Sequence, residues 1–154
     1  MLTAEEINEI EAEAVRYPKR EAVSIDALKI VQRHRGWVSD ESLRDIAGHL
    51  GMSPTDLDSV ATFYNLIFRR PVGRHVIMVC DSVSCWIMGH DRVKKHLTER
   101  LGIEFGQTTP DERFTLLPIV CLGCCDRAPA MMVGGDLLTD LDPQKIDIQL
   151  EKYK

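Results

Sequence analysis

The sequence lacks the features that identify several common protein classes. No apolar run approaches the ~20 residues that a membrane-spanning helix needs, so we expect no direct membrane insertion. The first residues are polar and acidic and do not resemble a signal peptide. A Gly-rich dinucleotide fingerprint and a P-loop are both missing, so we expect this chain to bind neither NADH nor ATP itself.

A large excess of charge of one sign is also missing. The 154 residues include 19 Lys and Arg against 24 Asp and Glu, a net charge of −5 at pH 7, which argues against a general nucleic-acid binder. Residues 39–68 do resemble a helix-turn-helix. Its second helix would begin Thr55-Asp56-Leu57-Asp58, however, and these carboxylates would lie where DNA phosphates belong. We therefore expect no nucleic-acid partner, and a small helical bundle used for packing or docking.

Histidine pairs are missing, whereas cysteines are present in number. None of the five histidines lies four residues from another, and none stands near a carboxylate at metal-ligand spacing, so we exclude Rieske-type ligation. The five cysteines are an odd number in a chain without a recognisable leader. This pattern points to reduced thiols or a metal and not to a disulfide framework.

Four of the cysteines form two local pairs, Cys80 with Cys85 and Cys121 with Cys125, spaced C-x4-C and C-x3-C. Each pair follows an apolar run rich in β-branched residues, 75–79 and 114–120, which predicts a buried strand. Each pair therefore lies where a strand ends and a loop begins, as ligand sites in open sheets often do. If the two strands are neighbours, the four sulfurs form one site.

Four thiolates suit either zinc or an iron–sulfur cluster. The small residues of 81–84 and the 122–123 turn would let backbone N–H groups approach a cluster. A helix expected from Ser84 to about Leu101 would direct its free N–H groups at the same place. Spacing alone favours a 2Fe-2S cluster over zinc and leaves open a disulfide or no site. Dithiol exchange is disfavoured, because the only literal C-x-x-C, Cys121 to Cys124, follows the second strand.

The chain divides by pattern into a helical part, residues 1–72, and an α/β part, residues 73–154, so the expected class is α+β. Helix starts are expected at these polar residues: Thr3 with Glu6 as a capping box, Ser24, Ser39, and Ser53 before Pro54. Residues 68–74 carry three arginines and predict a solvated basic linker. From residue 74 the order is strand, cysteine loop, long helix, strand, cysteine loop, short strands and final helix, which fits a thioredoxin-like domain.

These features resemble one family, the E subunit of bacterial NADH:quinone oxidoreductase (respiratory complex I), counterpart of the mitochondrial 24-kilodalton subunit. The likeness covers nearly the whole chain, and its cysteine pattern is specific. The segments that carry it are Gly36-Trp37-Val38, Val60-Ala61-Thr62-Phe63-Tyr64, Gly73-Arg74-His75-Val76-Ile77 leading to Cys80-x4-Cys85, and Cys121-Leu122-Gly123-x-Cys125 followed by Ala128-Pro129.

The resemblance implies a one-electron carrier with a 2Fe-2S cluster bound by Cys80, Cys85, Cys121 and Cys125 in a thioredoxin-like domain. It implies a partner subunit that holds FMN and the NADH site, within a larger assembly, and no independent active site in this chain. The expected location is the peripheral arm of a respiratory-chain enzyme, on the cytoplasmic face of the inner membrane. The remaining alternatives are the equivalent diaphorase subunit of an NAD-reducing hydrogenase or formate dehydrogenase, and a zinc-binding structural module.

Two positions near the second pair carry separate expectations. The family pattern C-L-G-x-C selects Cys125 as the ligand, so we expect Cys124 to be a small neighbour facing away from the metal. Pro129 stands where thioredoxin-like folds often place a cis proline before the third strand. A trans turn is nevertheless the expectation there, because trans is the commoner isomer.

Overall fold

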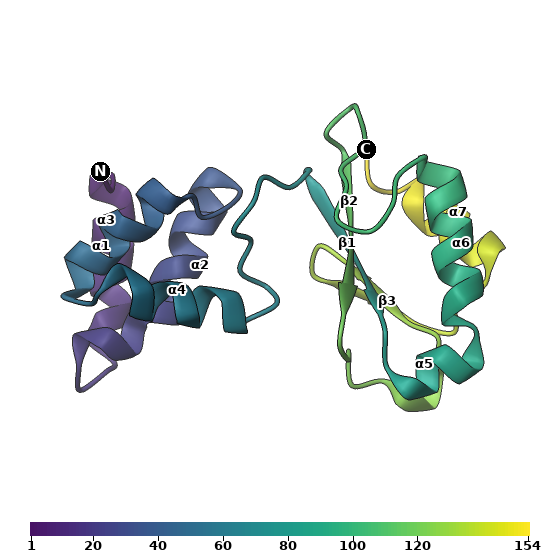
Figure 1. Ribbon diagram of the computed structural model, residues 1–154, viewed down its shortest axis with the longest axis horizontal. Helices are drawn as coiled ribbons and strands as arrows, with labels where there is room; N and C mark the ends of the chain where they lie inside the picture. Colours follow the sequence, from purple (N-terminus) through teal and green to yellow (C-terminus); the bar gives the residue numbers. More distant parts are fainter. The chain divides into compact units, whose positions relative to one another are not determined.

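The computed structural model describes residues 1–154, which form two compact units, Met1–Pro71 and Val72–Lys154 (Figure 1). The first unit is helical and the second contains the sheet, in the order that the sequence pattern indicates. That each unit is an independent domain stays a prediction. No helix in either unit combines the length and the apolar character that crossing a bilayer demands.

The first unit consists of four helices and one short 3-10 turn. Their bounds are α1 Ala4–Ala14, the 3-10 turn Arg20–Val23, α2 Ser24–Arg35, α3 Asp40–Leu50 and α4 Pro54–Phe63. One apolar core fills the space between them. Its largest fully buried side chains are Ile10, Leu28, Ile46 and Leu57.

Side-chain caps explain where three of these helices begin. The capping box at α1 is present: Thr3 and Glu6 each accept a hydrogen bond from the other's backbone N–H, at 3.2 and 2.7 Å. Ser39 and Ser53 cap α3 and α4 as predicted. The cap predicted at Ser24 is wrong. The 3-10 turn leads directly into α2, and the N–H of Ser24 bonds the Glu21 carbonyl within that turn, so no side-chain cap forms.

A buried ion pair ties α1 to the end of α2. The Glu6 side chain is 1% exposed, and Arg35 donates to both of its carboxylate oxygens at 2.7 Å. This guanidinium, acting against the cost of burial, lowers the pKa of Glu6 to about 2. The helical unit therefore contains a carboxylate whose charge is part of the fold.

The aromatic residues at the end of α4 do not face the core of the helical unit. The helix ends at Phe63, and the backbone of Tyr64 turns extended. Phe63 is 78% exposed and Tyr64 is 42% exposed, so neither belongs to the core. Helical periodicity would place Tyr64 on the same face as Leu57 and Ala61, but it does not apply beyond the last helical residue.

Arg69 contradicts the prediction of a solvated linker over residues 68–74. Its guanidinium donates to Asp58 at 2.9 Å, to Asp40 at 2.6 Å and to the carbonyl of Val38. These bonds hold the segment against α3 and α4 within the helical unit. Arg70 by contrast is exposed. Two adjacent arginines thus have different roles, because only one lies within reach of buried and acidic acceptors.

The second unit is built on a four-stranded sheet in the order β2-β1-β3-β4. Its strands are β1 His75–Cys80, β2 Phe114–Ile119, β3 Met131–Val133 and β4 Asp136–Leu138, and its helices are α5 Val83–Met88, α6 His90–Leu101 and α7 Pro143–Leu150. Strands β1 and β2 are parallel and are connected through α5 and α6, so the predicted order of strand, helix and strand is confirmed and forms a βαβ unit. Helices α6 and α7 pack together on one face of the sheet (Figure 1).

The single long helix expected from Ser84 to about Leu101 is wrong in one respect. Gly89 adopts φ 118°, which breaks the helix into α5 and α6. Glycine tolerates this left-handed conformation because it has no Cβ. The presence of Gly89 in a helical pattern was not enough to predict that the helix would break there.

The proline that precedes β3 also differs from the expectation. The Ala128–Pro129 peptide bond is cis, so the predicted trans turn is wrong. The preference for trans before proline is only about 0.5–1 kcal/mol, too small for sequence to decide. Strands β3 and β4 pair as an antiparallel hairpin, and the Asp142 side chain caps α7, which gives the expected short strands and final helix.

Candidate metal-cluster site

The register of the sheet brings the two cysteine pairs to one edge. Cys80, the last residue of β1, lies beside Ile119, the last residue of β2. Beyond the strands, the N–H of Asp81 still donates to the carbonyl of Ile119 at 2.8 Å. Because the two strands are parallel, the loops that follow them leave from the same end. Cys121 follows Ile119 by two residues and so enters the same space.

The first pair is the inner one. Cys80 and Cys85 are each 2% exposed. Cys80 is fixed as a strand residue, and its N–H donates to the carbonyl of Ala130 at 3.0 Å. Cys85 lies in α5, which begins after Ser82, and its thiol is close enough to that of Cys80 for one to affect the pKa of the other. Burial and backbone bonding give this pair well-defined positions.

The second pair is the outer one. Cys121 and Cys125 are exposed thiols, and Cys125 begins a short 3-10 turn, Cys125–Arg127. The N–H of Gly123 donates to the sulfur of Cys121 at 3.3 Å. Gly123 has φ 78°, a left-handed conformation that turns the backbone back toward that sulfur. The Leu122-Gly123 turn therefore supplies an N–H donor, as its composition suggested.

The pKa values of the thiols show how these side chains act on one another. Burial, and next the thiol of Cys80, raise the pKa of Cys85 to about 11. The Gly123 N–H lowers the pKa of Cys121, with smaller contributions from Ser82 and from the thiols of Cys125 and Cys80. The thiol of Cys80 thus affects the pKa of a thiol in each loop, and we call Cys85, Cys80, Cys121 and Cys125, in this order, the string of thiols.

This donor set suits a thiolate-bound iron–sulfur cluster. Four sulfurs come from two loops on neighbouring strands, and backbone N–H groups of Gly123 and Ala130 act on them. Such N–H donors stabilise the negative charge that a cluster spreads over its sulfurs. All five cysteines are free thiols, and no three His, Cys, Asp or Glu side chains are grouped closely enough to hold a single metal ion.

Cys124 lies beside the string and is half-buried. Burial raises its pKa, followed by the charges of Cys80, Asp126 and Cys125. Its neighbour Cys125 is the thiol that acts directly on Cys121. The choice between the two as the fourth ligand stays a prediction in favour of Cys125.

Sequence reasoning missed an exposed apolar surface next to the cysteines, which we call the α5 surface. Its members are Val83 (67% exposed), Trp86 (62%), Ile87 (72%), Met88 (57%) and, beside Cys121, Val120 (72%). Three of them are consecutive, and consecutive residues of a helix cannot all face one core. The consecutive apolar residues Trp86, Ile87 and Met88 were therefore the feature of the sequence that could have revealed this surface. Large apolar side chains exposed in such numbers are typical of interaction surfaces.

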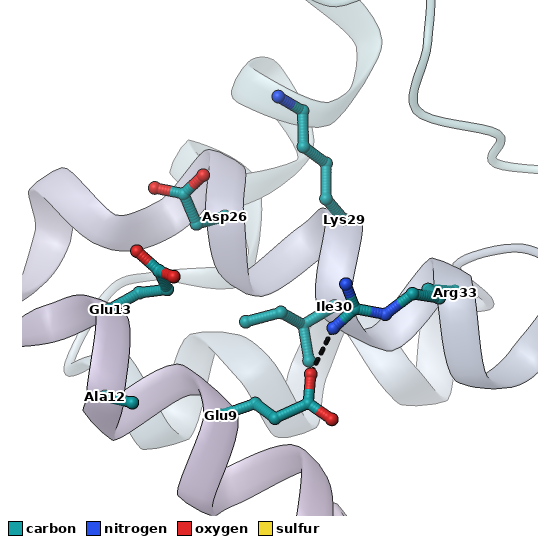
Figure 2. Close-up of a pocket in the computed structure, with 7 residues that line it drawn as sticks. All are labelled: Glu9, Ala12, Glu13, Asp26, Lys29, Ile30 and Arg33. Atoms are coloured by element: carbon teal, nitrogen blue, oxygen red, sulfur yellow. Dashed lines mark hydrogen bonds and ion pairs between the residues drawn. The ribbon is translucent and has the colours of Figure 1, made fainter. Parts of the chain in front are cut away.

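A hollow in the helical unit has no comparable chemistry. It lies between α1 and α2, has a volume of about 280 Å³, and is lined by Glu9, Ala12, Glu13, Asp26, Lys29, Ile30 and Arg33. Figure 2 shows that the Glu9 carboxylate is paired with the Arg33 guanidinium. His34 contacts the same carboxylate at 2.9 Å. Glu9 and Arg33 of this hollow therefore already satisfy each other.

Comparisons with known proteins agree with this geometry. Residues 10–154 match the model of the thioredoxin-like 2Fe-2S ferredoxin family. The E subunit of the NADH-quinone oxidoreductase of Escherichia coli K12 is 51% identical over 153 residues, 99% of this chain and 92% of the relative. The corresponding E subunit of Buchnera aphidicola from Acyrthosiphon pisum is 50% identical, again over 99% of this chain, and over 94% of that protein.

A solved structure is similar to this chain over most of its length. It is the air-oxidised state of an NAD+-reducing NiFe-hydrogenase, with a TM-score of 0.69 and 28% sequence identity. The similarity covers 82% of this chain but only 22% of that one. Together with the family match, this similarity confirms the predicted thioredoxin-like fold preceded by helices.

Proposed function

Because this chain belongs to the thioredoxin-like 2Fe-2S ferredoxin family, among the E subunits of NADH-quinone oxidoreductases, we propose that it carries single electrons on a 2Fe-2S cluster. The observation that carries this proposal is the string of four thiols formed by two loops on neighbouring parallel strands. A bound cluster of this kind supplies one reversible electron-accepting centre. The family's relatives are subunits of an oxidoreductase, and we propose no independent active site in this chain.

The proposed ligands are Cys80, Cys85, Cys121 and Cys125. Cys80 and Cys85 bury one side of the site and keep water from it. The N–H of Gly123 donates to the sulfur of Cys121, and the backbone of Ala130 acts to lower the pKa of Cys85, so both favour the thiolate forms. Cys121 and Cys125 are exposed, which leaves the other side open to a redox partner. The inner pair thus protects the cluster from water, and the outer pair lets a redox partner approach it.

The proposed partner is the flavin- and NADH-binding subunit of the same assembly. The relatives are named as subunits of an NADH-quinone oxidoreductase, and this sequence contains no dinucleotide fingerprint of its own. The α5 surface supports such a contact, because it flanks the exposed cysteines. A partner bound there would cover apolar side chains and bring its flavin close to the cluster. FMN and NADH then belong to the partner.

A second candidate function is the equivalent subunit of an NAD-reducing hydrogenase, which the similarity to the hydrogenase structure favours. Near-complete coverage of the quinone oxidoreductase relatives at 50% identity supports the first candidate instead. The same relationship supports a place on the peripheral arm, at the cytoplasmic face of the inner membrane. Purification of the native assembly decides between the two: a membrane-associated quinone reductase supports our proposal, and a NiFe-hydrogenase supports the second candidate.

Metal analysis tests the cofactor directly. An anaerobically purified chain should contain iron and acid-labile sulfide in equal amounts and should be brown-red. A zinc-binding structural module would instead be colourless and contain zinc. A dithiol oxidoreductase would reduce an insulin disulfide and contain no metal.

A further inference from the structure

His90 is a buried histidine that lies directly behind the first cysteine pair. It is the first residue of α6 and is only 4% exposed. Its Nδ1 lies 3.0 Å from the main-chain oxygen of Cys80. Because a carbonyl oxygen can only accept, Nδ1 carries a proton and donates it to this bond. The other ring nitrogen, Nε2, lies 3.8 Å from a carboxylate oxygen of Asp81.

This hydrogen bond closes the segment that contains both inner cysteines. Cys80 is at one end of the segment, Cys85 lies within it on α5, and His90 is at the other end. Between α5 and α6 only Gly89 intervenes, in a left-handed conformation. The Nδ1 bond is therefore a direct side-chain link from the start of α6 back to the end of β1.

The bond also gives one peptide group a hydrogen-bond partner on its second side. The peptide between Cys80 and Asp81 donates its N–H to Ile119 and offers its carbonyl to His90. The N–H of Cys80 itself donates to Ala130. The other two partners are the backbone carbonyl oxygens of Ile119 and Ala130, so His90 provides the one side-chain contact among the three. Its loss would leave a buried carbonyl without this partner and the peptide plane held on one side only.

We propose that His90 is a positioning residue for the cluster, which it serves by holding the Cys80 carbonyl and thus the geometry of the inner pair. The inference rests on the proposed function, since it needs a cluster at these cysteines. Outer-shell hydrogen bonds of this kind orient ligands and tune the metal centre, and their loss typically weakens metal retention about 10–100-fold. His90 was not marked by any pattern in the sequence.

Three substitutions in the full-length chain separate the hydrogen bond from packing. In His90→Asn the amide N–H can occupy the place of Nδ1, whereas in His90→Gln it reaches toward the place of Nε2. In His90→Phe a ring remains to pack near Phe105, whose centroid is 6.4 Å from that of His90, but no donor is left. His96→Gln is the control, because His96 lies on the same helix and contacts Asp147 at 3.0 Å.

The readouts are the EPR spectrum of the reduced cluster and the rate at which a chelator removes iron. We expect His90→Asn and His96→Gln to match the wild type. His90→Phe and His90→Gln should show shifted, broadened g-values and lose iron about 10-fold faster. Unchanged spectra and rates in these two variants would overturn the inference. If His90→Phe does not fold by circular dichroism, the Asn and Gln pair decides, and equal behaviour of that pair overturns the inference. A wild-type chain without iron would instead refute the proposed function.

Discussion

Among single residues, Cys124 and Cys125 offer the sharpest distinction, because they are adjacent and only one is a proposed ligand. Cys125 acts directly on Cys121, whereas Cys124 is half-buried beside the string of thiols. Cys124→Ser should therefore keep the visible absorption of the cluster, and Cys125→Ser should lose or alter it. Absorption spectra of the two anaerobically purified variants measure this. The opposite result would assign the ligand to Cys124.

Glu6 makes a second prediction at the residue scale. Its pKa is lowered from 4.5 to about 2 in the folded state, mainly by Arg35. Its charge therefore stabilises the fold above pH 4.5, and this stabilisation is lost as the pH falls from 4.5 toward 2. At pH 7, Glu6→Gln should lower the free energy of unfolding by about 3 kcal/mol, and the loss should shrink below pH 4.5.

Urea unfolding followed by circular dichroism measures this effect, with Glu5→Gln as a control. Glu5 is exposed on the same helix, so its substitution should change stability by less than about 0.5 kcal/mol. Cluster absorbance in the same experiment reports on the second unit and should persist while the helical unit of Glu6→Gln unfolds. Equal stability of the two variants would show that the buried pair contributes nothing.

Among the structural elements, the segment after α4 depends on Arg69. The guanidinium bonds two carboxylates and one carbonyl, whereas the neighbouring Arg70 is exposed. Arg69→Ala should lower the free energy of unfolding of the helical unit by about 2 kcal/mol, since it breaks charged hydrogen bonds at a half-buried site. Arg70→Ala should change it by less than about 0.5 kcal/mol. Chemical denaturation distinguishes the two, and a larger loss for Arg70→Ala would contradict the structure.

The short helix α5 makes the prediction about assembly. Ile87 is 72% exposed within the α5 surface, and Ile148 is 61% exposed on α7, so neither substitution to Gln should disturb the core. Ile87→Gln should weaken binding to the flavin-binding subunit about 10-fold, because a contact at the centre of an interface is worth about 1–2 kcal/mol. Ile148→Gln should bind normally. Calorimetric titration of the two variants measures this, and matching affinities would place the partner elsewhere.

Across the whole molecule, sequence reasoning succeeded where one local rule decided the outcome. Strand patterns before each cysteine pair implied a shared edge of the sheet, and the register of Cys80 beside Ile119 confirms it. Capping residues marked most helix starts for the same reason. Sequence reasoning missed the contacts of Arg69, the break at Gly89 and the hydrogen bond of His90, which no local pattern marked. Local sequence does not specify which acceptor a side chain reaches after folding.

The two units have separate cores and remain, in our proposal, separate domains with different tasks. The second holds the cluster, and the first provides a helical surface with exposed aromatics. The proposed function depends on one claim, that the four thiols bind a cluster that accepts an electron.

EPR spectroscopy of the anaerobically purified, dithionite-reduced chain tests that claim most directly. The account predicts a rhombic signal that integrates to one unpaired electron per bound cluster, with iron and acid-labile sulfide in equal amounts. A folded chain that carries zinc, or that shows no signal after reduction, would contradict it.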